Sequence, residues 1–300
     1  MSEQPHSAEH FTESRDLWWH GDYLDLVASR LGLRNCNAVV DVGAGVGHWT
    51  ALIVARCAPG ATLTAVDREK PWVAELGRRF GSRPGFRAAE ADAASLPLPA
   101  ASADLVTAQT LLVVVPDAPK VLREMHRVLR PGGLLLLAEP NNFANRMQMT
   151  SVLAALSPAD YGRLATFWFA FEKGKEKLGL GQEWIAELLP KLIVDAGFVD
   201  LRAFNNDRAW AFFPPYATQE QLLSRGDTDE SKRRAEEKAE RELMERCVLA
   251  GGLDQSAFAA GLELLEEIGQ AEERAYENNE YSALQSGGLH VFAARKPGAD

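Results

Sequence analysis

A run of β-branched residues leads straight into a turn with three glycines in the segment VVDVGAGVGHWT, which spans residues 39–50. Glycine at positions 43, 45 and 47 allows positive φ angles and lets the backbone approach a ligand without a Cβ in the way. A helix that follows such a turn offers unpaired backbone N–H groups. We therefore expect a polar or anionic ligand group to bind where this strand ends.

Short apolar runs alternate with helix-length segments between residues 37 and 115, which is typical of βαβ units and a parallel sheet. A helix with one apolar face is predicted from residue 118 and ends at the sequence RPGG, where proline and glycine stop it. The predicted strands span residues 38–43, 61–67, 85–92, 103–110, 134–140, 198–204 and 288–296.

Beyond Pro140 the alternation ends. Residues 141–180 form an aromatic-rich stretch that we predict to be an irregular insertion. A helix interrupted by Pro190, and then a strand, return the chain to the sheet. The residues 216–285 that follow are helix-prone and densely charged at their start, so we interpret them as a helical cap with a solvated face. The apolar stripe expected to dock this cap on the sheet domain consists of Phe258, Leu262, Leu265 and Ile268.

Composition and charge limit the class of protein. The chain has 300 residues, of which 46% are hydrophobic, enough for one large domain or two. A formal net charge of −10 opposes attraction to nucleic-acid phosphates. No apolar run is long enough to span a membrane, and the polar start favours a cytoplasmic protein. The three cysteines lie far apart without CxxC spacing, so neither a metal site nor a disulfide framework is predicted.

Three acidic residues lie at or near the ends of the predicted strands, at places that suit a nucleoside ligand. Asp41 precedes a GxGxG turn, which differs from the GxGxxG turn of dinucleotide-binding proteins, and its carboxylate would repel a pyrophosphate but attract an ammonium group. Asp67 ends the second strand, where a carboxylate can accept hydrogen bonds from both hydroxyls of a ribose. Asp92 follows the third strand and could receive an exocyclic amine. Asp67 and Asp92 could instead be structural carboxylates.

Four segments occur in the order found in class I S-adenosylmethionine-dependent methyltransferases: VVDVGAGVGHWT, AVD, ADAASLPLPAASADLV and LREMHRVLRPGGLLLLAEP. From about residue 38 to 140 the chain resembles the small-molecule group of that family, which includes the ubiquinone and menaquinone methyltransferases. The resemblance implies an α/β fold that is Rossmann-like and doubly wound, with a mostly parallel seven-stranded sheet and helical cap insertions. It also implies S-adenosylmethionine as the cofactor. The implied cofactor-binding residues are Asp41, Gly43, Ala44, Gly45, Gly47, Asp67, Arg68, Asp92, Ala93, Gln109, Trp19 and Tyr23.

The domain organisation expected on this basis follows the order of the chain. It comprises an N-terminal helical segment over the cofactor site (1–36), a cofactor-binding core (37–140), an insertion that caps the substrate (141–182), a core helix and strand (183–215), a helical cap (216–286) and a final strand with a tail (287–300).

The acceptor side of the site has weaker signals. Many members of this group have a histidine-rich stretch after the fourth strand, but here Val113 and Val114 stand in its place and suggest an apolar wall. Glu139 and His20 are the candidate acid/base residues. Glu139 could equally be a structural carboxylate, and His20 a surface or capping residue. Aromatic residues in the segment 166–174 could contact an apolar acceptor or simply pack the insertion.

The favoured function is methyl transfer by in-line displacement to an oxygen, nitrogen or carbon atom of a small, mostly apolar or aromatic molecule. An alternative is a catalytically inactive protein that keeps the cofactor fold for binding or regulation. An NAD-dependent oxidoreductase is disfavoured because the GxGxxG spacing is missing. Neither nucleic acid nor a membrane is an expected partner, and the oligomeric state stays open.

Overall fold

The computed structural model describes residues 15, 18–224, 230–286 and 288–298, and the chain divides into two units. Unit 1 comprises residues 1–141, 185–207 and 289–300, and unit 2 comprises residues 142–184 and 208–288. Much of the predicted N-terminal segment, residues 1–14 and 16–17, lies outside the described residues. Unit 2 is therefore inserted into unit 1 at two places in the sequence.

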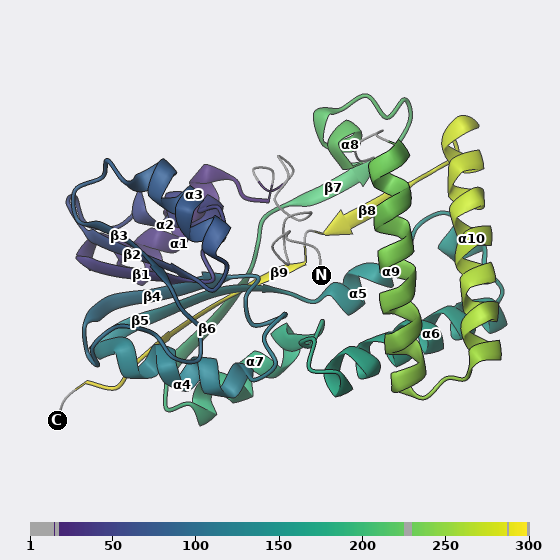
Figure 1. The fold of residues 1–300 in the computed structure, drawn as a ribbon. Coiled ribbons are helices and arrows are strands. Elements are labelled where there is room, and N and C mark those ends of the chain that lie inside the picture. Colours follow the sequence, from purple (N-terminus) through teal and green to yellow (C-terminus); the bar gives the residue numbers. More distant parts are fainter. Residues whose placement is uncertain (1–14, 16–17, 225–229, 287, 299–300) are drawn as a thin grey trace. The chain divides into compact units, whose positions relative to one another are not determined.

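Unit 1 contains a seven-stranded sheet in the order β3-β2-β1-β4-β5-β9-β6, parallel except for β9, which confirms the predicted fold class (Figure 1). Its strands are β1 (Ala38–Val42), β2 (Thr62–Asp67), β3 (Phe86–Glu90), β4 (Ala103–Gln109), β5 (Leu129–Pro140), β6 (Val199–Asn205) and β9 (Leu289–Arg295). Its helices are α1 (Gly21–Leu31), η3 (Leu33–Asn35), α2 (His48–Val54), α3 (Lys70–Phe80), α4 (Ala118–Val128) and α7 (Ile185–Asp195).

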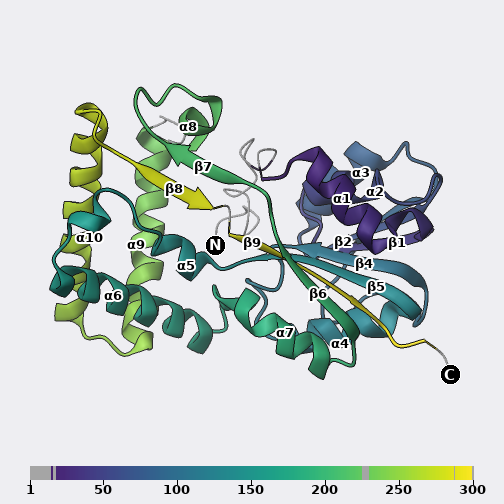
Figure 2. The same ribbon diagram turned by 180° about the vertical axis from the view of Figure 1, so that it is seen from behind.

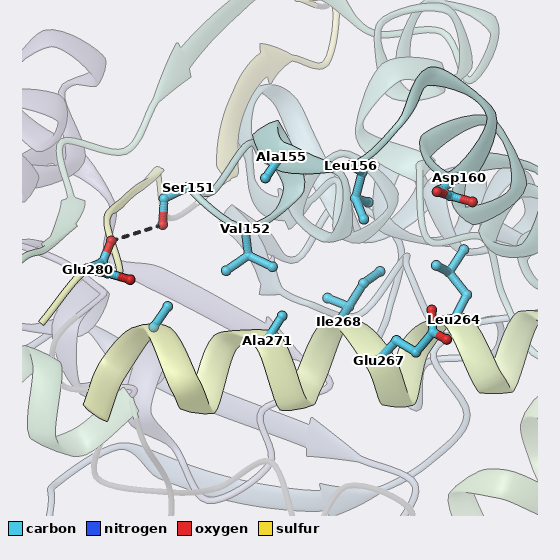
Figure 3. Close-up of a pocket in the computed structure, with 11 residues that line it drawn as sticks. Ser151, Val152, Ala155, Leu156, Asp160, Leu264, Glu267, Ile268, Ala271 and Glu280 are labelled. Atoms are coloured by element: carbon cyan, nitrogen blue, oxygen red, sulfur yellow. Dashed lines mark hydrogen bonds between the residues drawn. The ribbon is translucent and has the colours of Figure 1, made fainter. Parts of the chain in front are cut away.

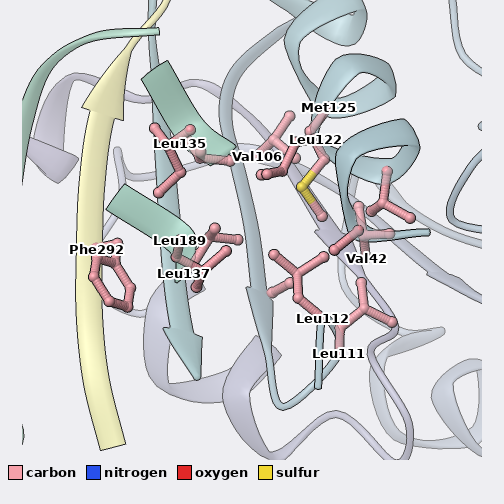
Figure 4. Packing of buried hydrophobic residues seen from close by; sticks show 14 of the residues in the cluster. Val42, Val106, Leu111, Leu112, Leu122, Met125, Leu135, Leu137, Leu189 and Phe292 are labelled. Atoms are coloured by element: carbon pink, nitrogen blue, oxygen red, sulfur yellow. The ribbon is translucent and has the colours of Figure 1, made fainter. Parts of the chain in front are cut away.

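Both faces of the central strands of this sheet are buried. Alternate residues of each strand point to opposite faces, so Val40 and Val42 join the cluster that packs on α4 and α7, whereas Val39 joins the cluster that packs on α1 and α2. Figure 4 shows the first cluster, with Leu122 and Met125 from α4 facing the side chains of the strands. Helix α7 continues through Pro190 rather than breaking there as predicted.

The carboxyl edge of the sheet is where the chain passes between the two units. Because β5 and β6 are parallel and β9 runs antiparallel between them, Pro140, Asn205 and Leu289 lie at the same edge. The chain leaves unit 1 shortly after Pro140 and after Asn205, and it re-enters at Leu289. Ligands of open α/β sheets bind at this edge.

Unit 2 is mainly helical, and α9 and α10 run side by side with α6 across them (Figure 2). Its elements are α5 (Asn142–Arg146), η4 (Leu153–Ala155), α6 (Pro158–Lys177), β7 (Ala209–Phe212), α8 (Gln219–Ser224), α9 (Glu230–Gly251), α10 (Gln255–Glu277) and β8 (Ala283–Ser286). The prediction of an irregular insertion at 141–180 was wrong, because Ser157 caps α6 by accepting a hydrogen bond from the Asp160 N–H and Pro158 opens the helix. The antiparallel pair β7–β8 was also not predicted.

The apolar stripe of α10 packs within unit 2. Phe258 stacks on Phe167 of α6, with ring centroids 6.1 Å apart, and Ile268 belongs to a cluster with Leu164 of α6. The expectation that this stripe docks on the sheet domain was wrong, because α6 supplies the apolar partner that the stripe requires. No helix in the described ranges is long and apolar enough to cross a membrane.

Candidate functional site

The glycine turn follows β1 and is fastened to β2. The N–H groups of Gly43 and Ala44 both donate to the Val66 carbonyl, at 2.8 and 3.0 Å. Gly43, Gly45 and Gly47 have φ values of 69°, 53° and 85°, which side-chain-bearing residues rarely adopt. In addition, a Cβ on Gly43 would lie 2.6 Å from Leu111 Cδ1. The glycine pattern thus gives a backbone-lined turn at the carboxyl edge.

Asp41 lies beneath this turn and is almost completely buried. Its Oδ2 accepts a hydrogen bond from the Thr50 hydroxyl, and its Oδ1 has no hydrogen-bond partner among the described residues. Burial and, to a smaller extent, the nearby Asp67 raise the pKa of Asp41 to about 7, although the hydrogen bond from Thr50 lowers it. A buried carboxylate oxygen without a donor fits the ammonium group of an amino-acid moiety.

Asp67, at the end of β2, is held by the same turn. Its Oδ2 accepts from the Gly45 N–H at 2.8 Å and its Oδ1 from the Glu69 N–H at 2.9 Å. Burial raises its pKa, although both N–H groups oppose this shift. Each carboxylate oxygen keeps a second lone pair, so the pair of oxygens can still accept from two hydroxyls. Arg68 pairs with Glu69 through its Nε at 3.2 Å.

The predicted adenine-side residues lie in the exposed loop after β3. Asp92 Oδ1 accepts a hydrogen bond from the Ala94 N–H at 2.7 Å, and the Ser95 N–H donates to the Asp92 carbonyl at 2.9 Å. Ala93 is partly buried between them. The Asp92 carboxylate therefore stabilises the loop to which it belongs. This contact is compatible with a structural role and also with binding of an exocyclic amine.

Aromatic residues from α1, from α2 and from the segment before α1 meet beside the turn. Trp19 stacks on Tyr23 with centroids 6.1 Å apart and lies 5.2 Å from the ring of Trp49 in α2. The Trp49 indole N–H donates to Thr107 Oγ1 of β4 at 2.7 Å. Trp19 is buried and belongs to the core cluster of α1 and α2. The structure thus brings the predicted Trp19 and Tyr23 together and ties them to β4.

Glu139 is completely buried and holds the segment after β4. Its Oε1 accepts from the N–H groups of Leu111 and Leu112 at 3.0 and 2.8 Å, and its Oε2 from the Val113 N–H at 3.2 Å. Burial raises the pKa of Glu139 to about 7 although these three donors oppose the shift. Because the Glu139 carboxylate accepts from three backbone N–H groups, a structural role fits it better than the role of a base.

The end of β4 is less buried than Glu139. Gln109 is partly buried and pairs in register with Ala138 of β5, and Thr110 has a φ of 51°. Val113 is buried in the core and Val114 is exposed, so the two valines do not form a continuous apolar wall. His48 is the first residue of α2.

His20 occupies the N-cap position of α1, but its side chain makes no capping hydrogen bond. Instead its Nδ1 lies 2.6 Å from Oδ2 of Asp207, just beyond β6. Sequence reasoning missed Asp207, because 187 residues separate the pair and no local motif marks it. The described residues contain no cluster of histidine, cysteine and acidic side chains suited to a metal ion.

Unit 2 contains a pocket of about 400 Å³ between the segment 151–160 and α10 (Figure 3). Val152, Leu156 and Ile268 provide apolar walls. Carboxylates are contributed by three of its lining residues, Asp160, Glu267 and Glu280, and none of the lining residues is basic. The pocket therefore suits a neutral or cationic guest better than an anionic one.

A buried group of charges in unit 2 was also missed by sequence reasoning. Arg146 Nη1 lies 2.5 Å from Glu172 Oε1, and Lys175 pairs with Glu183. Burial and the neighbouring Glu183 raise the pKa of Glu172 to about 7. The pairing of two acids with two bases makes their burial tolerable, and it fixes α5 and α6 to the chain before α7.

Raising the pH from about 5 to 8 is expected to lower the free energy of unfolding in the absence of ligand. The folded-state pKa of Asp41 is raised from 3.8 to about 7, so the folded chain binds more protons than the unfolded chain between these values. The contribution of Asp41 to the free energy of unfolding is fully present below pH 3.8, and it is lost as the pH rises through about 7. Urea unfolding at several pH values measures the slope, and Asp41→Asn should make it shallower. An equal slope in the variant would contradict the burial argument.

Comparisons with known proteins agree with the geometry. Residues 40–137 match the family model described as a methyltransferase domain. The demethylmenaquinone methyltransferase of Staphylococcus aureus is 28% identical over 188 residues, which cover 59% of this chain and 73% of the relative.

Two solved structures share the fold. A candidate methyltransferase from Bacillus halodurans aligns with a TM-score of 0.50 at 17% identity, covering 92% of this chain and 99% of that one. A chain from the complex of the Haloferax volcanii Trm112 methyltransferase activator with a candidate methyltransferase gives a TM-score of 0.51 at 16% identity, with coverages of 96% and 92%.

The strand order, the glycine turn with its buried orphan carboxylate oxygen, and the matching domain model lead to one conclusion. Residues 40–137 of this chain form a methyltransferase domain with the fold of the class I S-adenosylmethionine-dependent enzymes, and S-adenosylmethionine is the cofactor of such a domain.

Proposed function

We propose that this enzyme methylates a small, mostly apolar or aromatic molecule by in-line displacement. S-adenosylmethionine supplies an electrophilic methyl group on a sulfonium when it is bound. The turn Gly43–Gly47 would hold its methionine moiety, with Asp41 facing the ammonium group. Asp67 would accept the ribose hydroxyls, and the loop at Asp92 would contact the adenine.

The observation that carries the acceptor class is an aromatic cluster in unit 2, formed by Phe143, Phe169 and Trp184. Phe169 stacks on Trp184 with centroids 5.5 Å apart, and Phe143 meets both rings edge-on at 6.3 and 5.8 Å. The Phe169 side chain is nevertheless 51% exposed. An aromatic face left in contact with solvent supports binding of a planar apolar molecule.

Chain connectivity also supports this assignment. Phe143 follows Pro140, the last residue of β5, by only three positions, and Trp184 directly precedes α7. The S. aureus relative is named for a quinone, demethylmenaquinone, which is an acceptor of the same general kind. The net charge of −10 speaks against a nucleic-acid acceptor.

Glu139 would support the reaction indirectly. Its carboxylate fixes the N–H groups of residues 111–113, and Leu111 packs against Gly43 of the glycine turn. We therefore assign Glu139 a positioning role in place of proton transfer.

The test first measures binding of S-adenosylmethionine and S-adenosylhomocysteine by calorimetry, with NAD as the control ligand. Turnover of a panel of aromatic and aliphatic acceptors follows, with Phe169→Ala and the matched control Phe213→Ala, a phenylalanine of unit 2 that is 50% exposed. Loss of one stacking contact should raise KM for aromatic acceptors about three- to tenfold in Phe169→Ala alone.

Two results would contradict the proposal. Tight binding of NAD without binding of either sulfur ligand would overturn the placing of S-adenosylmethionine at the glycine turn. Equal KM values for Phe169→Ala and Phe213→Ala would remove the aromatic cluster from acceptor binding.

A further inference from the structure

The pocket of unit 2 is a groove along one face of α10, and we call it the α10 groove. The residues of α10 that line it are Leu264, Glu267, Ile268, Ala271 and Ala275. Residues three and four positions apart share a helix face, so these five residues form a single stripe. At a rise of 1.5 Å per residue the stripe is about 16 Å long. The volume of about 400 Å³ is therefore elongated, and it suits a chain-like molecule.

The floor of the α10 groove is apolar, and small residues give it depth. Leu264 and Ile268 are buried in the cluster that α10 forms with α6, so their positions are fixed by packing. Further along the helix Ala271 and Ala275 carry only a methyl group, as does Ala155 in the segment that forms the other wall. The groove occupies the space that larger side chains at these positions would fill.

The two walls are joined at one end of the α10 groove. The Ser151 hydroxyl donates to the carbonyl oxygen of Glu280 at 3.4 Å, which Figure 3 shows as a dashed line. The Ser151 N–H also donates to the carbonyl of Ser282 at 2.8 Å. These bonds hold the segment before α6 against the segment after α10. The spacing of the walls is thus set by the protein itself.

The other end of the α10 groove carries an excess of negative charge, and Figure 3 shows Asp160 and Glu267 there. Asp160 accepts a hydrogen bond from the Ser157 hydroxyl at 2.7 Å and pairs with Arg163. Glu267 and Glu263 lie close enough to Arg163 to raise its pKa, although Asp160 raises it more. Three carboxylates thus surround one guanidinium group.

The same sign of charge prevails along the whole helix. Six glutamates and a single arginine belong to α10, and none of the residues that line the groove is basic. Solvent-exposed carboxylates each contribute little to binding. Together they produce a negative potential that attracts cations and repels anions. The apolar floor would therefore supply most of the affinity of a ligand, and the carboxylates would select its charge.

We propose that the α10 groove is a binding site for an alkylammonium ion, which combines an apolar chain with one protonated amine. The chain would lie over Ile268 and Ala271, with the ammonium group at the end that holds Asp160 and Glu267. A fatty acid of the same length would bring its carboxylate to this acidic end and be repelled. The groove shares no residue with the aromatic cluster of the proposed acceptor site. The inference therefore goes beyond the proposed function and does not depend on it.

The first experiment titrates the full chain with octylamine, octanol and octanoate by calorimetry, without cofactor. The three probes share one chain and differ in charge. Octylamine, protonated at pH 7, should bind with a Kd on the order of 100 µM. Octanol should bind at least about threefold more weakly and octanoate at least about tenfold more weakly, because they meet the same carboxylates without a positive charge. Added salt should reduce these differences.

A pair of neighbouring glutamates tests the charged end. Glu267→Gln should weaken octylamine binding about two- to fivefold and leave octanol binding unchanged. The matched control is Glu266→Gln, because Glu266 is exposed on the same turn of α10 but does not line the groove. Its affinities for both probes should equal those of the wild-type protein.

A pair of alanines tests the floor. Ala271→Leu should fill the α10 groove and weaken octylamine binding at least about tenfold. Ala259 is exposed on the same helix and does not line the groove, so Ala259→Leu should bind octylamine as the wild-type protein does. Thermal unfolding checks that both variants fold. If Ala271→Leu does not fold, the two glutamine variants still decide the outcome.

Three results would overturn the proposal: no binding of octylamine by the wild-type protein, binding of octanol or octanoate as tight as that of octylamine, or equal octylamine affinities in Glu267→Gln and Glu266→Gln. None of these measurements uses S-adenosylmethionine or a methyl acceptor. Their failure would therefore leave the proposed function untouched, and a failure of the proposed function would leave this site untouched.

Discussion

Gly174→Ala is expected to destabilise unit 2 by about 3 kcal/mol or more, because α6 and α9 are in backbone contact at this residue. A Cβ on Gly174 would lie 1.6 Å from the Cys247 carbonyl oxygen and 2.7 Å from its Cα. A second close approach occurs at Gly251, whose Cβ would lie 1.8 Å from the Ala170 carbonyl oxygen. Neither backbone can move alone, so the helices must separate. Thermal unfolding should show a fall in Tm of about 10 °C.

The same helix offers a matched control. Gly162 is also in α6, but a Cβ there would have no atom within 4 Å. Gly162→Ala should therefore stabilise the protein by up to about 1 kcal/mol through helix propensity. Hydrogen exchange of peptides from α6 and α9 would localise the effect of Gly174→Ala. Similar Tm values for the two variants would show that the helices do not meet as closely as the structure has them.

Glu139→Ala is expected to cost about 3 kcal/mol or more of unfolding free energy. The substitution leaves the N–H groups of Leu111, Leu112 and Val113 buried without an acceptor, and each orphaned donor costs about 1–3 kcal/mol. Glu139→Gln should cost less, because its amide oxygen can still accept from the first two. Denaturant unfolding of both variants measures the difference. Equal stability of Glu139→Ala and the wild-type protein would show that other groups satisfy these donors.

Sequence reasoning predicted the parts of the candidate site that depend on short segments. The glycine turn, Asp41 and Asp67 lie within 27 residues. The glycines are recognisable because the turn requires positive φ angles, and the two acids because they lie near strand ends. The central strands β1, β4 and β5 were equally predictable from the sequence, because burial on both faces makes them rich in apolar residues.

The parts that escaped prediction depend on distant contacts. Helix α6 has no single apolar face, because Phe167 and Phe171 are buried while Phe169 is exposed and stacks on Trp184. Its sequence therefore lacks the periodicity that identifies a helix. The partnership of His20 with Asp207 spans 187 residues, and residue spacing alone cannot reveal such a pair.

The position of β9 governs the order in which unit 1 can be completed during synthesis. This strand is the last in the sequence, yet it lies between β5 and β6 and pairs with both. Until residues 289–295 leave the ribosome, β6 has no neighbour through which to join the sheet. The hydrophobic edge of β5 stays unpaired while nearly 150 further residues are synthesised. A nascent chain of this enzyme thus exposes an unpaired strand edge during the synthesis of those residues, and such edges favour aggregation.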